Sequence, residues 1–177
     1  MVGTMGFMHT GMQVMIVNIE TPLPAELQSY IEICENSLLR NEPTEFLYPN
    51  ELIGKRIADP IWEQKISEVK APNEPLLSSL RNKANVYAIF TKESNNQWVK
   101  KYVGERKAID MRQRITSHLI NKNSGTGSKL DYVREAVSRG EKIGLRFIFI
   151  PRDTMRTFVE EEIISKNKSE LPWNNHG

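Results

Sequence analysis

Four side chains in the second half of the chain could together hydrolyse a phosphodiester: Tyr87, Tyr102, Arg114 and Glu160. The reaction requires an activated water, charge relief on the phosphate and a stabilised leaving oxygen. The Arg114 guanidinium is planar and permanently charged, which suits a phosphate. The Glu160 carboxylate, with water and phosphate oxygens, is sufficient for Mg²⁺, because one or two carboxylates usually hold that ion.

The two tyrosines are predicted to face the same side of the fold. They lie 15 residues apart, on the two arms of a short predicted hairpin. A phenol ionises near pH 10, so a tyrosine acts as a base only where a nearby cation favours its anion. Residues 100–146 contain 12 basic and 5 acidic side chains, which supply such a field.

Hydrophobic periodicity and turn residues predict the elements that position these groups. After residue 82 we expect strands at 86–91 and 98–103, helices at 109–121 and 128–139, a strand at 143–150 and a helix from Asp153. Before it we expect a helix from Thr21 to Leu38, loops with a short helix at 41–60, a helix to Lys70, a linker at 71–75 and a short helix at 76–80. The fold class is therefore α+β, with a small mixed, mostly antiparallel sheet flanked by helices and a mainly helical N-terminal region.

The sequence suggests three parts. Residues 1–15 hold five of the seven methionines and no Lys or Arg, so we expect a poorly ordered, vector-derived or over-extended start rather than a secretion signal. Residues 16–82 are the helical N-terminal region. Residues 83–177 are the domain that carries the chemistry.

Composition excludes several classes of protein. The 177 residues are 39% hydrophobic and 26% charged, close to the globular average. No run of about 18 apolar residues occurs, which excludes a transmembrane helix. The single cysteine, Cys34, cannot form an internal disulfide, so a cytoplasmic location fits best. Residues 1–84 carry a net charge of −4 and residues 85–177 carry +6, which indicates a polyanion partner for the second half.

Five ordered motifs resemble the GIY-YIG nuclease family over roughly residues 83–177. They are Asn85-Val86-Tyr87, with Asn85 where the family usually has glycine, then Tyr102-Val103-Gly104, Arg114 followed four places later by His118, the segment 159–164 around Glu160, and Pro172-Trp173-Asn174. The segment from Ser128 to Gly140 and the Pro-Trp-Asn ending resemble the restriction-enzyme and phage-endonuclease branch of that family.

Two spacings leave alternatives open. The gap between Gly104 and the arginine is about two residues longer than the resemblance implies, so Arg112 is an alternative to Arg114. The gap between the glutamate and Asn174 is also about two longer, so Glu161 and Glu162 are alternatives to Glu160.

The resemblance implies a role for each matching residue. Tyr87 would help to activate the attacking water, with Tyr102 in support, and Arg114 would stabilise charge on phosphorus. His118 would hydrogen-bond the phosphate or orient the water, and Glu160 would hold one Mg²⁺, or Mn²⁺, near the leaving oxygen. Asn174 would clamp backbone near the site. Basic candidates for contacts with backbone phosphates are Lys107, Arg112, Lys129 and Arg134.

These observations favour a Mg²⁺-dependent DNA endonuclease, sequence-selective and of restriction type. One site per chain makes a homodimer or homotetramer natural for cutting two strands. A structure-directed or RNA nuclease is one alternative. A nucleic-acid-binding module of the same fold that has lost catalysis is another, motivated by Asn85 and the two longer gaps.

Overall fold

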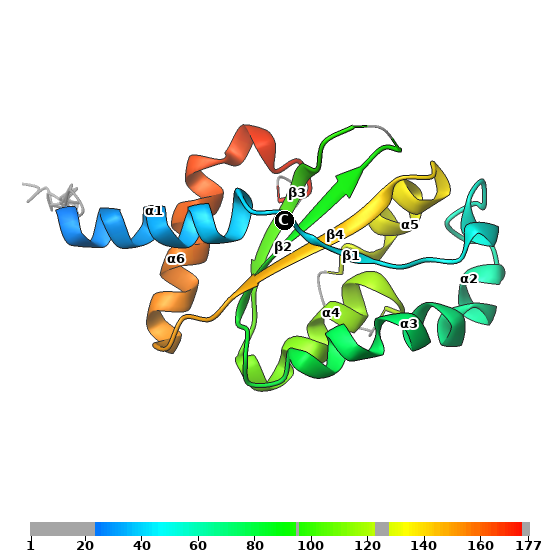
Figure 1. The fold of residues 1–177 in the computed structure, drawn as a ribbon, viewed down its shortest axis with the longest axis horizontal. Helices are drawn as coiled ribbons and strands as arrows, with labels where there is room; N and C mark the ends of the chain where they lie inside the picture. Colours follow the sequence, from blue (N-terminus) through cyan, green and yellow to red (C-terminus); the bar gives the residue numbers. More distant parts are fainter. Residues whose placement is uncertain (1–23, 95, 123–127, 175–177) are drawn as a thin grey trace, which may run out of the picture.

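The computed structural model describes residues 24–94, 96–122 and 128–174, and in these residues four strands form one sheet (Figure 1). The strand order is β1-β4-β2-β3 and every pairing is antiparallel. The strands are β1 (Thr44–Phe46), β2 (Val86–Lys92), β3 (Val99–Glu105) and β4 (Lys142–Ile148). The predicted α+β fold class is confirmed.

Helices cover both faces of the sheet. The α-helices are α1 (Ala25–Leu39), α2 (Ile61–Gln64), α3 (Ile66–Ser79), α4 (Met111–Leu119), α5 (Leu130–Ser138) and α6 (Asp153–Lys166). Short 3₁₀ turns are η1 (Asn50–Leu52), η2 (Ala108–Asp110) and η3 (Lys168–Glu170). Helices α1 and α6 lie together on one side, whereas α3, α4 and α5 lie on the other (Figure 1).

Alternation along the strands divides the core in two. On β2, Tyr87 and Ile89 belong to the cluster formed with α3, α4 and α5, whereas Val86, Ala88 and Phe90 belong to the cluster formed with α1 and α6. Successive strand residues point to opposite faces, so a single strand serves both layers. We call the first surface the α4 face and the second the α1/α6 face.

The predicted hairpin is present and puts the two tyrosines on one surface. Strand β2 pairs with β3 so that Tyr87 lies opposite Gly104 and Ile89 opposite Tyr102, with an irregularity in the register after Ile89. Both phenol rings lie in the cluster on the α4 face. The sequence-based expectation for their placement is therefore confirmed.

The segment predicted as loops at 41–60 also contains a strand. Strand β1 pairs with β4, with Glu45 opposite Gly144, and forms an edge of the sheet. Its three residues are too few to show a period-two pattern, and Pro43 and Pro49 flank it. The predicted boundary at residue 83 thus runs through segments that share one sheet.

The linker predicted at 71–75 is wrong, because α3 continues through Pro72 and Pro75. A proline removes the hydrogen bond to the carbonyl four residues earlier, here those of Glu68 and Ala71. The two prolines, Glu68 and Ala71 are all exposed, so water can solvate the freed carbonyls. Buried Val69 and Leu77 hold the helix against the core from its other side.

Some predictions fall outside the described residues, namely the poorly ordered start at 1–15 and the beginning of the helix expected from Thr21. Within the described ranges, no helix combines the length and apolar character that a membrane crossing requires.

Candidate functional site

The hydroxyl oxygen of Tyr87 is the meeting point of the site. Its side chain is 0% exposed. His118 Nε2 lies 2.6 Å from this oxygen, and the Arg114 Nε–H donates to it over 3.2 Å. Arg114 and His118 are four residues apart on α4, so they project from one helical face toward the sheet. The motif spacing in the sequence thus corresponds to a real contact.

The hydrogen bonds of His118 define its tautomer. The backbone N–H of Lys129 donates to His118 Nδ1 over 2.9 Å, so Nδ1 is unprotonated. Burial lowers the pKa of His118 to about 3, and the positive charges of Arg114 and Lys129 act in the same direction. The imidazole is therefore neutral at pH 7, carries its proton on Nε2 and donates it to Tyr87.

The predicted contact between His118 and phosphate is wrong for this arrangement. The side chain is 0% exposed and both ring nitrogens already have partners within the protein. A phosphate or an attacking water has no free imidazole nitrogen to meet. His118 instead donates its Nε2–H to the Tyr87 oxygen within the protein core.

Tyr102 is the tyrosine nearer to solvent, with 8% of its surface exposed. Its ring centroid lies 5.9 Å from that of Tyr87 and 5.5 Å from that of His118. Burial raises the pKa of Tyr102, and the charge of Glu160 adds to this. The Arg114 cation and hydrogen bonds with Tyr87 and Arg114 act in the opposite direction. The pKa of Tyr102 therefore depends on both Arg114 and the candidate metal ligand, Glu160.

Gly104 makes room for the two phenols. A Cβ atom built at this position would lie 2.7 Å from Tyr102 Cε1 and 2.7 Å from the Tyr87 hydroxyl oxygen. Real Cβ contacts are essentially never shorter than 3.0 Å. The glycine of the Tyr-Val-Gly motif is thus required by the close approach of the rings, not by its backbone conformation.

Glu160 lies on α6, and its pKa is shifted by its surroundings. Burial raises the pKa of Glu160 to about 7, and the carboxylates of Glu105 and Glu161 act in the same direction. Arg114 and Arg156 partly oppose that shift. Glu161 is exposed, whereas Glu160 is half-buried. Exposure therefore argues against Glu161 but not against Glu162, which is half-buried like Glu160. The electrostatic interaction of Glu160 with Arg114 and Tyr102 favours Glu160 over both.

The donor set around Glu160 fits a singly ligated Mg²⁺. A half-buried carboxylate beside a second carboxylate, Glu105, is an environment in which a cation relieves electrostatic repulsion. Mg²⁺ keeps several waters and is usually held by one or two carboxylates plus substrate oxygens. In the part of the chain that the structure describes, no group of three or more His, Cys, Asp or Glu side chains could hold an ion by itself.

Sequence reasoning missed two residues beside Glu160. Arg156 is buried on α6 and forms ion pairs with Glu105 and with Asp153, the latter at 2.9 Å. Arg156 precedes Glu160 by four residues, a spacing that places both on one helical face. Glu105 directly follows the Tyr-Val-Gly motif. The helical spacing was the available signal for Arg156, whereas no local pattern marks Glu105.

Asn174 clamps β3 beside the site, as its predicted role requires. Its Nδ2 donates to the Val103 carbonyl over 2.8 Å, and its Oδ1 accepts from the Val103 N–H over 2.9 Å. The preceding residue, Trp173, donates its backbone N–H to the Lys101 carbonyl over 3.0 Å. Its indole stacks on Tyr132 with ring centroids 5.6 Å apart. These contacts fix the segment after α6 along the edge of β3.

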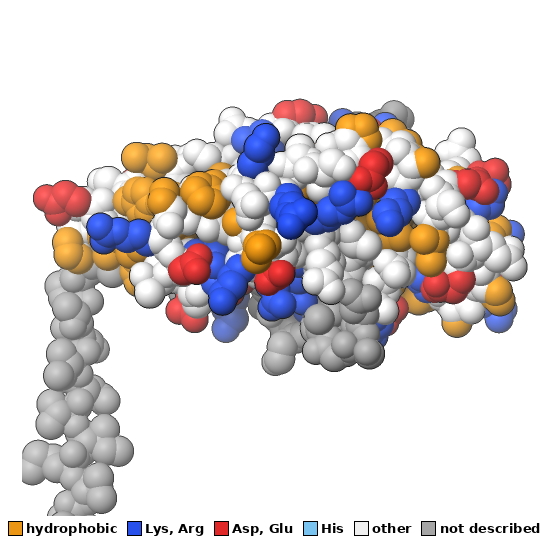
Figure 2. All heavy atoms as spheres, turned by 90° about the horizontal axis from the view of Figure 1, so that it is seen from below, with side chains coloured by type: hydrophobic (Ala, Val, Ile, Leu, Met, Phe, Trp, Pro, Cys, Tyr) orange, Lys and Arg blue, Asp and Glu red, His pale blue; other side chains and the backbone are white. Residues whose placement is uncertain are grey.

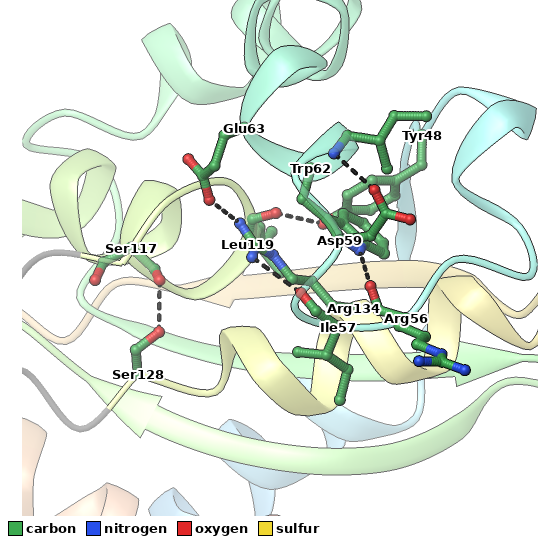
Figure 3. Close-up of polar contacts among 11 residues, drawn as sticks. Tyr48, Arg56, Ile57, Asp59, Trp62, Glu63, Ser117, Leu119, Ser128 and Arg134 are labelled. Atoms are coloured by element: carbon green, nitrogen blue, oxygen red, sulfur yellow. Dashed lines mark hydrogen bonds and ion pairs between the residues drawn. The ribbon is translucent and has the colours of Figure 1, made fainter.

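Two of the predicted phosphate contacts have other partners. Arg134 is buried and its guanidinium lies over the Trp62 ring, donates 2.7 Å to Glu63 and 3.4 Å to the Ile57 carbonyl (Figure 3). The prediction of a surface contact for Arg134 is therefore wrong. Arg112 pairs with Glu74 at 2.7 Å and does not contact the tyrosines, so the geometry favours Arg114 over Arg112.

The remaining two basic candidates differ in their surroundings. Lys107 is exposed at the start of η2. Lys129 Nζ lies 5.3 Å from the centroid of the Tyr102 ring and 5.9 Å from that of Tyr132. Burial lowers the pKa of Lys129, and the Arg114 cation adds to this. Lys129 therefore contributes positive charge to the site itself, whereas Lys107 contributes it to the surface.

Comparison with known protein families, with curated proteins and with solved structures gives no match for this chain. Arguments about its activity therefore depend on the geometry described above.

Proposed function

We propose that this protein is a Mg²⁺-dependent DNA endonuclease of the GIY-YIG type, acting by phosphodiester hydrolysis. One observation carries the proposal: N–H groups of Arg114 and His118 converge on the buried Tyr87 oxygen beside Tyr102. Glu160 is close enough for its charge to alter the pKa of Tyr102. A phenol pair, a guanidinium and a carboxylate in one place supply the functions that phosphodiester hydrolysis needs.

The two tyrosines have different tasks in this proposal. Tyr102 is the phenol nearer to solvent, so in this proposal its ionised form takes the proton from the attacking water. Burial raises the pKa of Tyr102, and the Arg114 cation partly offsets that shift. Tyr87 is enclosed and donates a hydrogen bond that favours the Tyr102 anion, while His118 and Arg114 hold its oxygen. This assignment reverses the order expected from the sequence, in which Tyr87 meets the water.

Arg114 and Glu160 complete the proposed chemistry. The half-buried Arg114 donates to the Tyr87 oxygen through Nε, and its guanidinium would stabilise the developing charge on the phosphate. Glu160 would hold the Mg²⁺ or Mn²⁺. The bound ion supplies charge relief at the leaving oxygen.

The polyanion partner is inferred from charge. The half of the chain that carries the site has a net charge of +6. Lys and Arg side chains form a broken band across the middle of one face, with Asp and Glu among them (Figure 2). Such a surface attracts backbone phosphates without selecting a base sequence. Sequence preference, a restriction-type role and assembly as a dimer or tetramer belong to the same proposal.

The test compares two adjacent carboxylates. Plasmid DNA is incubated with Mg²⁺ and the wild-type protein, Glu160→Gln or Glu161→Gln. We expect discrete fragments with the wild type and with Glu161→Gln, and a loss of at least about 100-fold in the initial rate with Glu160→Gln. Linear, branched and RNA substrates run in parallel to separate a sequence-selective DNA nuclease from a structure-directed or RNA nuclease.

Two outcomes would contradict the proposal. Absence of cleavage of every substrate in Mg²⁺ and in Mn²⁺ would remove the enzymatic activity and leave a binding module. Equal cleavage by the wild type and Glu160→Gln would remove Glu160 as the metal ligand.

A further inference from the structure

Asn85, directly before β2, makes two side-chain hydrogen bonds with the backbone of one distant residue. Its side chain is buried, and its Nδ2 donates to the Ile150 carbonyl over 2.7 Å while its Oδ1 accepts from the Ile150 N–H over 2.8 Å. The side-chain amide therefore takes the place of a neighbouring strand for Ile150. A glycine at position 85 could not make either of these bonds.

The backbone of Asn85 connects two further segments. Its N–H donates to the Ile148 carbonyl over 3.1 Å, and its carbonyl accepts from the Arg106 N–H over 3.0 Å. The end of β4, the end of β3 and the start of β2 thus meet at this one residue. All four of its polar backbone and amide functions are used in that junction.

The junction is the base from which α6 begins. Only Pro151 and Arg152 separate Ile150 from the first residue of α6, Asp153. One turn into the helix, Arg156 pairs with Glu105, which lies beside Arg106 at the end of β3. Glu160 follows one further turn along, about 6 Å up the helix axis. Glu160 is therefore placed by a short rigid arm that starts at the Asn85 junction.

We propose that Asn85 is a positioning residue for the metal centre: its amide fixes the start of α6 and thereby holds Glu160 beside Tyr102. This inference rests on the proposed function, because it assigns Asn85 a role at the same metal site. Asn174 fixes the segment that follows α6 through an equivalent amide–backbone pair with Val103. The helix that carries Glu160 is thus anchored on both sides of its length.

The chain offers a matched control for Asn85. Buried Asn73 makes the same two-point contact with the backbone of Leu47, accepting from its N–H over 2.8 Å and donating to its carbonyl over 2.8 Å. This pair ties α3 to the residue after β1 and has no contact with α6. Replacement of Asn73 removes a comparable set of hydrogen bonds, so it reproduces the loss of stability without the loss of position.

The experiment measures Mn²⁺ affinity from the electron paramagnetic resonance signal of free Mn²⁺, in the absence of DNA. Wild type, Glu160→Gln, Asn85→Ala and Asn73→Ala are compared at a temperature at which circular dichroism shows each to be folded. We expect Asn85→Ala to weaken Mn²⁺ binding about 10-fold, the usual size of a supporting-residue effect. Asn73→Ala should stay within about twofold of the wild type. If Asn85→Ala does not fold, Asn85→Gly keeps both backbone bonds and is expected to give the same 10-fold loss.

The outcomes separate this inference from the proposed function. If wild type binds Mn²⁺, Glu160→Gln does not, and the Asn85 variants match Asn73→Ala, the metal site stands and the positioning role is overturned. If wild type does not bind Mn²⁺, the positioning role is overturned, and the plasmid cleavage assay decides the proposed function separately. A loss of affinity in the Asn85 variants alone supports the positioning role.

Discussion

The two faces of the sheet use the same strands for different purposes. On the α4 face, the Tyr87 and Tyr102 rings lie against Gly104, and Arg114 and His118 hydrogen-bond the Tyr87 oxygen. On the α1/α6 face, the Trp98 ring lies against Gly144 in the same way, since a Cβ there would be 2.7 Å from the indole. Each face therefore has a glycine with an aromatic ring packed on it.

The difference lies in what surrounds the rings. Lys92 Nζ lies 5.5 Å from the centroid of the Trp98 ring, and the indole N–H donates to Glu42 over 2.7 Å, so this ring joins the hairpin to the residues after α1. The phenols on the α4 face carry ionisable oxygens next to a guanidinium. Strand alternation therefore places a purely structural aromatic contact on the α1/α6 face and the candidate site on the α4 face. Glu160 is the exception, because it lies on α6, in the other layer.

The largest effect should distinguish the two arginines of α4. Arg114→Gln removes a charged donor from the Tyr87 oxygen and should lower the cleavage rate by about 10²- to 10³-fold. Arg112→Gln removes a half-exposed ion pair with Glu74 and a hydrogen bond to Ser78, so its rate should stay within about threefold of wild type. Initial rates on plasmid DNA at saturating Mg²⁺ measure both. Similar losses in both variants would mean that the orientation of Arg114 does not matter.

The two glycines test the comparison directly. Gly104→Ala and Gly144→Ala each introduce a Cβ at 2.7 Å from a ring, so each should lower the free energy of unfolding by about 1–3 kcal/mol. Only Gly104→Ala should also reduce cleavage, by about 100-fold, because it displaces the phenols. Urea unfolding and single-turnover rates give the two quantities. An equal loss of activity in Gly144→Ala would show that the faces are not functionally separate.

The free energy of unfolding should respond to pH in opposite directions at His118 and Glu160. The pKa of His118 is about 3 in the folded protein against an ordinary 6.5, so only the unfolded chain takes up this proton as pH falls below 6.5. His118 therefore destabilises the fold progressively between pH 6.5 and 3, by up to about 1.4 kcal/mol per pH unit. The pKa of Glu160 is about 7 against 4.5, so its ionisation destabilises the fold as pH rises from 4.5 through 7.

Urea unfolding at pH 5, 6, 7 and 8 separates these contributions. His118→Gln should lose less stability than wild type when the pH is lowered. The stability of Glu160→Gln relative to wild type should be higher at pH 8 than at pH 5. Addition of Mg²⁺ at pH 8 should raise the melting temperature of wild type but not that of Glu160→Gln. Parallel pH curves for all three proteins would contradict the assigned environments. Glu161→Gln serves as the control for a change in net charge.

The smallest effect concerns surface charge outside the two faces. Lys107→Gln should lower the slope of log affinity for DNA against log salt concentration by about 0.9, the value for one lost phosphate contact. Arg134→Gln should leave that slope unchanged, because its guanidinium is enclosed by Trp62, Glu63 and Ile57. Fluorescence anisotropy at several salt concentrations measures both. A reduced slope for Arg134→Gln would place DNA against α2 and α5.

Much of the fold could be predicted because its signals are local. The β-branched and aromatic run at 86–92 and the periodic apolar residues of α5 and α6 each indicate one element type. Strand β1 was not predicted, because its three residues are too few to show the alternation of apolar and polar side chains that marks a strand. The continuity of α3 escaped because prolines usually end a helix, and only tertiary structure shows that Pro72 and Pro75 face solvent.

The residues of the candidate site could be predicted from the sequence, but their hydrogen bonds and burial could not. The resemblance paired Arg114 with His118, and the predicted hairpin placed Tyr87 and Tyr102 on one side of the fold. The proton on His118 Nε2 depends on a hydrogen bond from Lys129, eleven residues further along the chain, which no spacing reveals. The burial of Arg134 depends on α2, seventy residues away. Such properties arise from packing between distant segments.

The clamp on β3 has a consequence for solubility. Edge strands offer unpaired N–H and carbonyl groups to other chains, which is a route to aggregation. Trp173 and Asn174 pair with the Lys101 carbonyl and with both backbone groups of Val103, so these edge groups are not available to an incoming strand from another copy. Removal of residues 173–177 should therefore expose unpaired backbone groups on the edge of β3 and increase aggregation. Light scattering during storage would measure that aggregation.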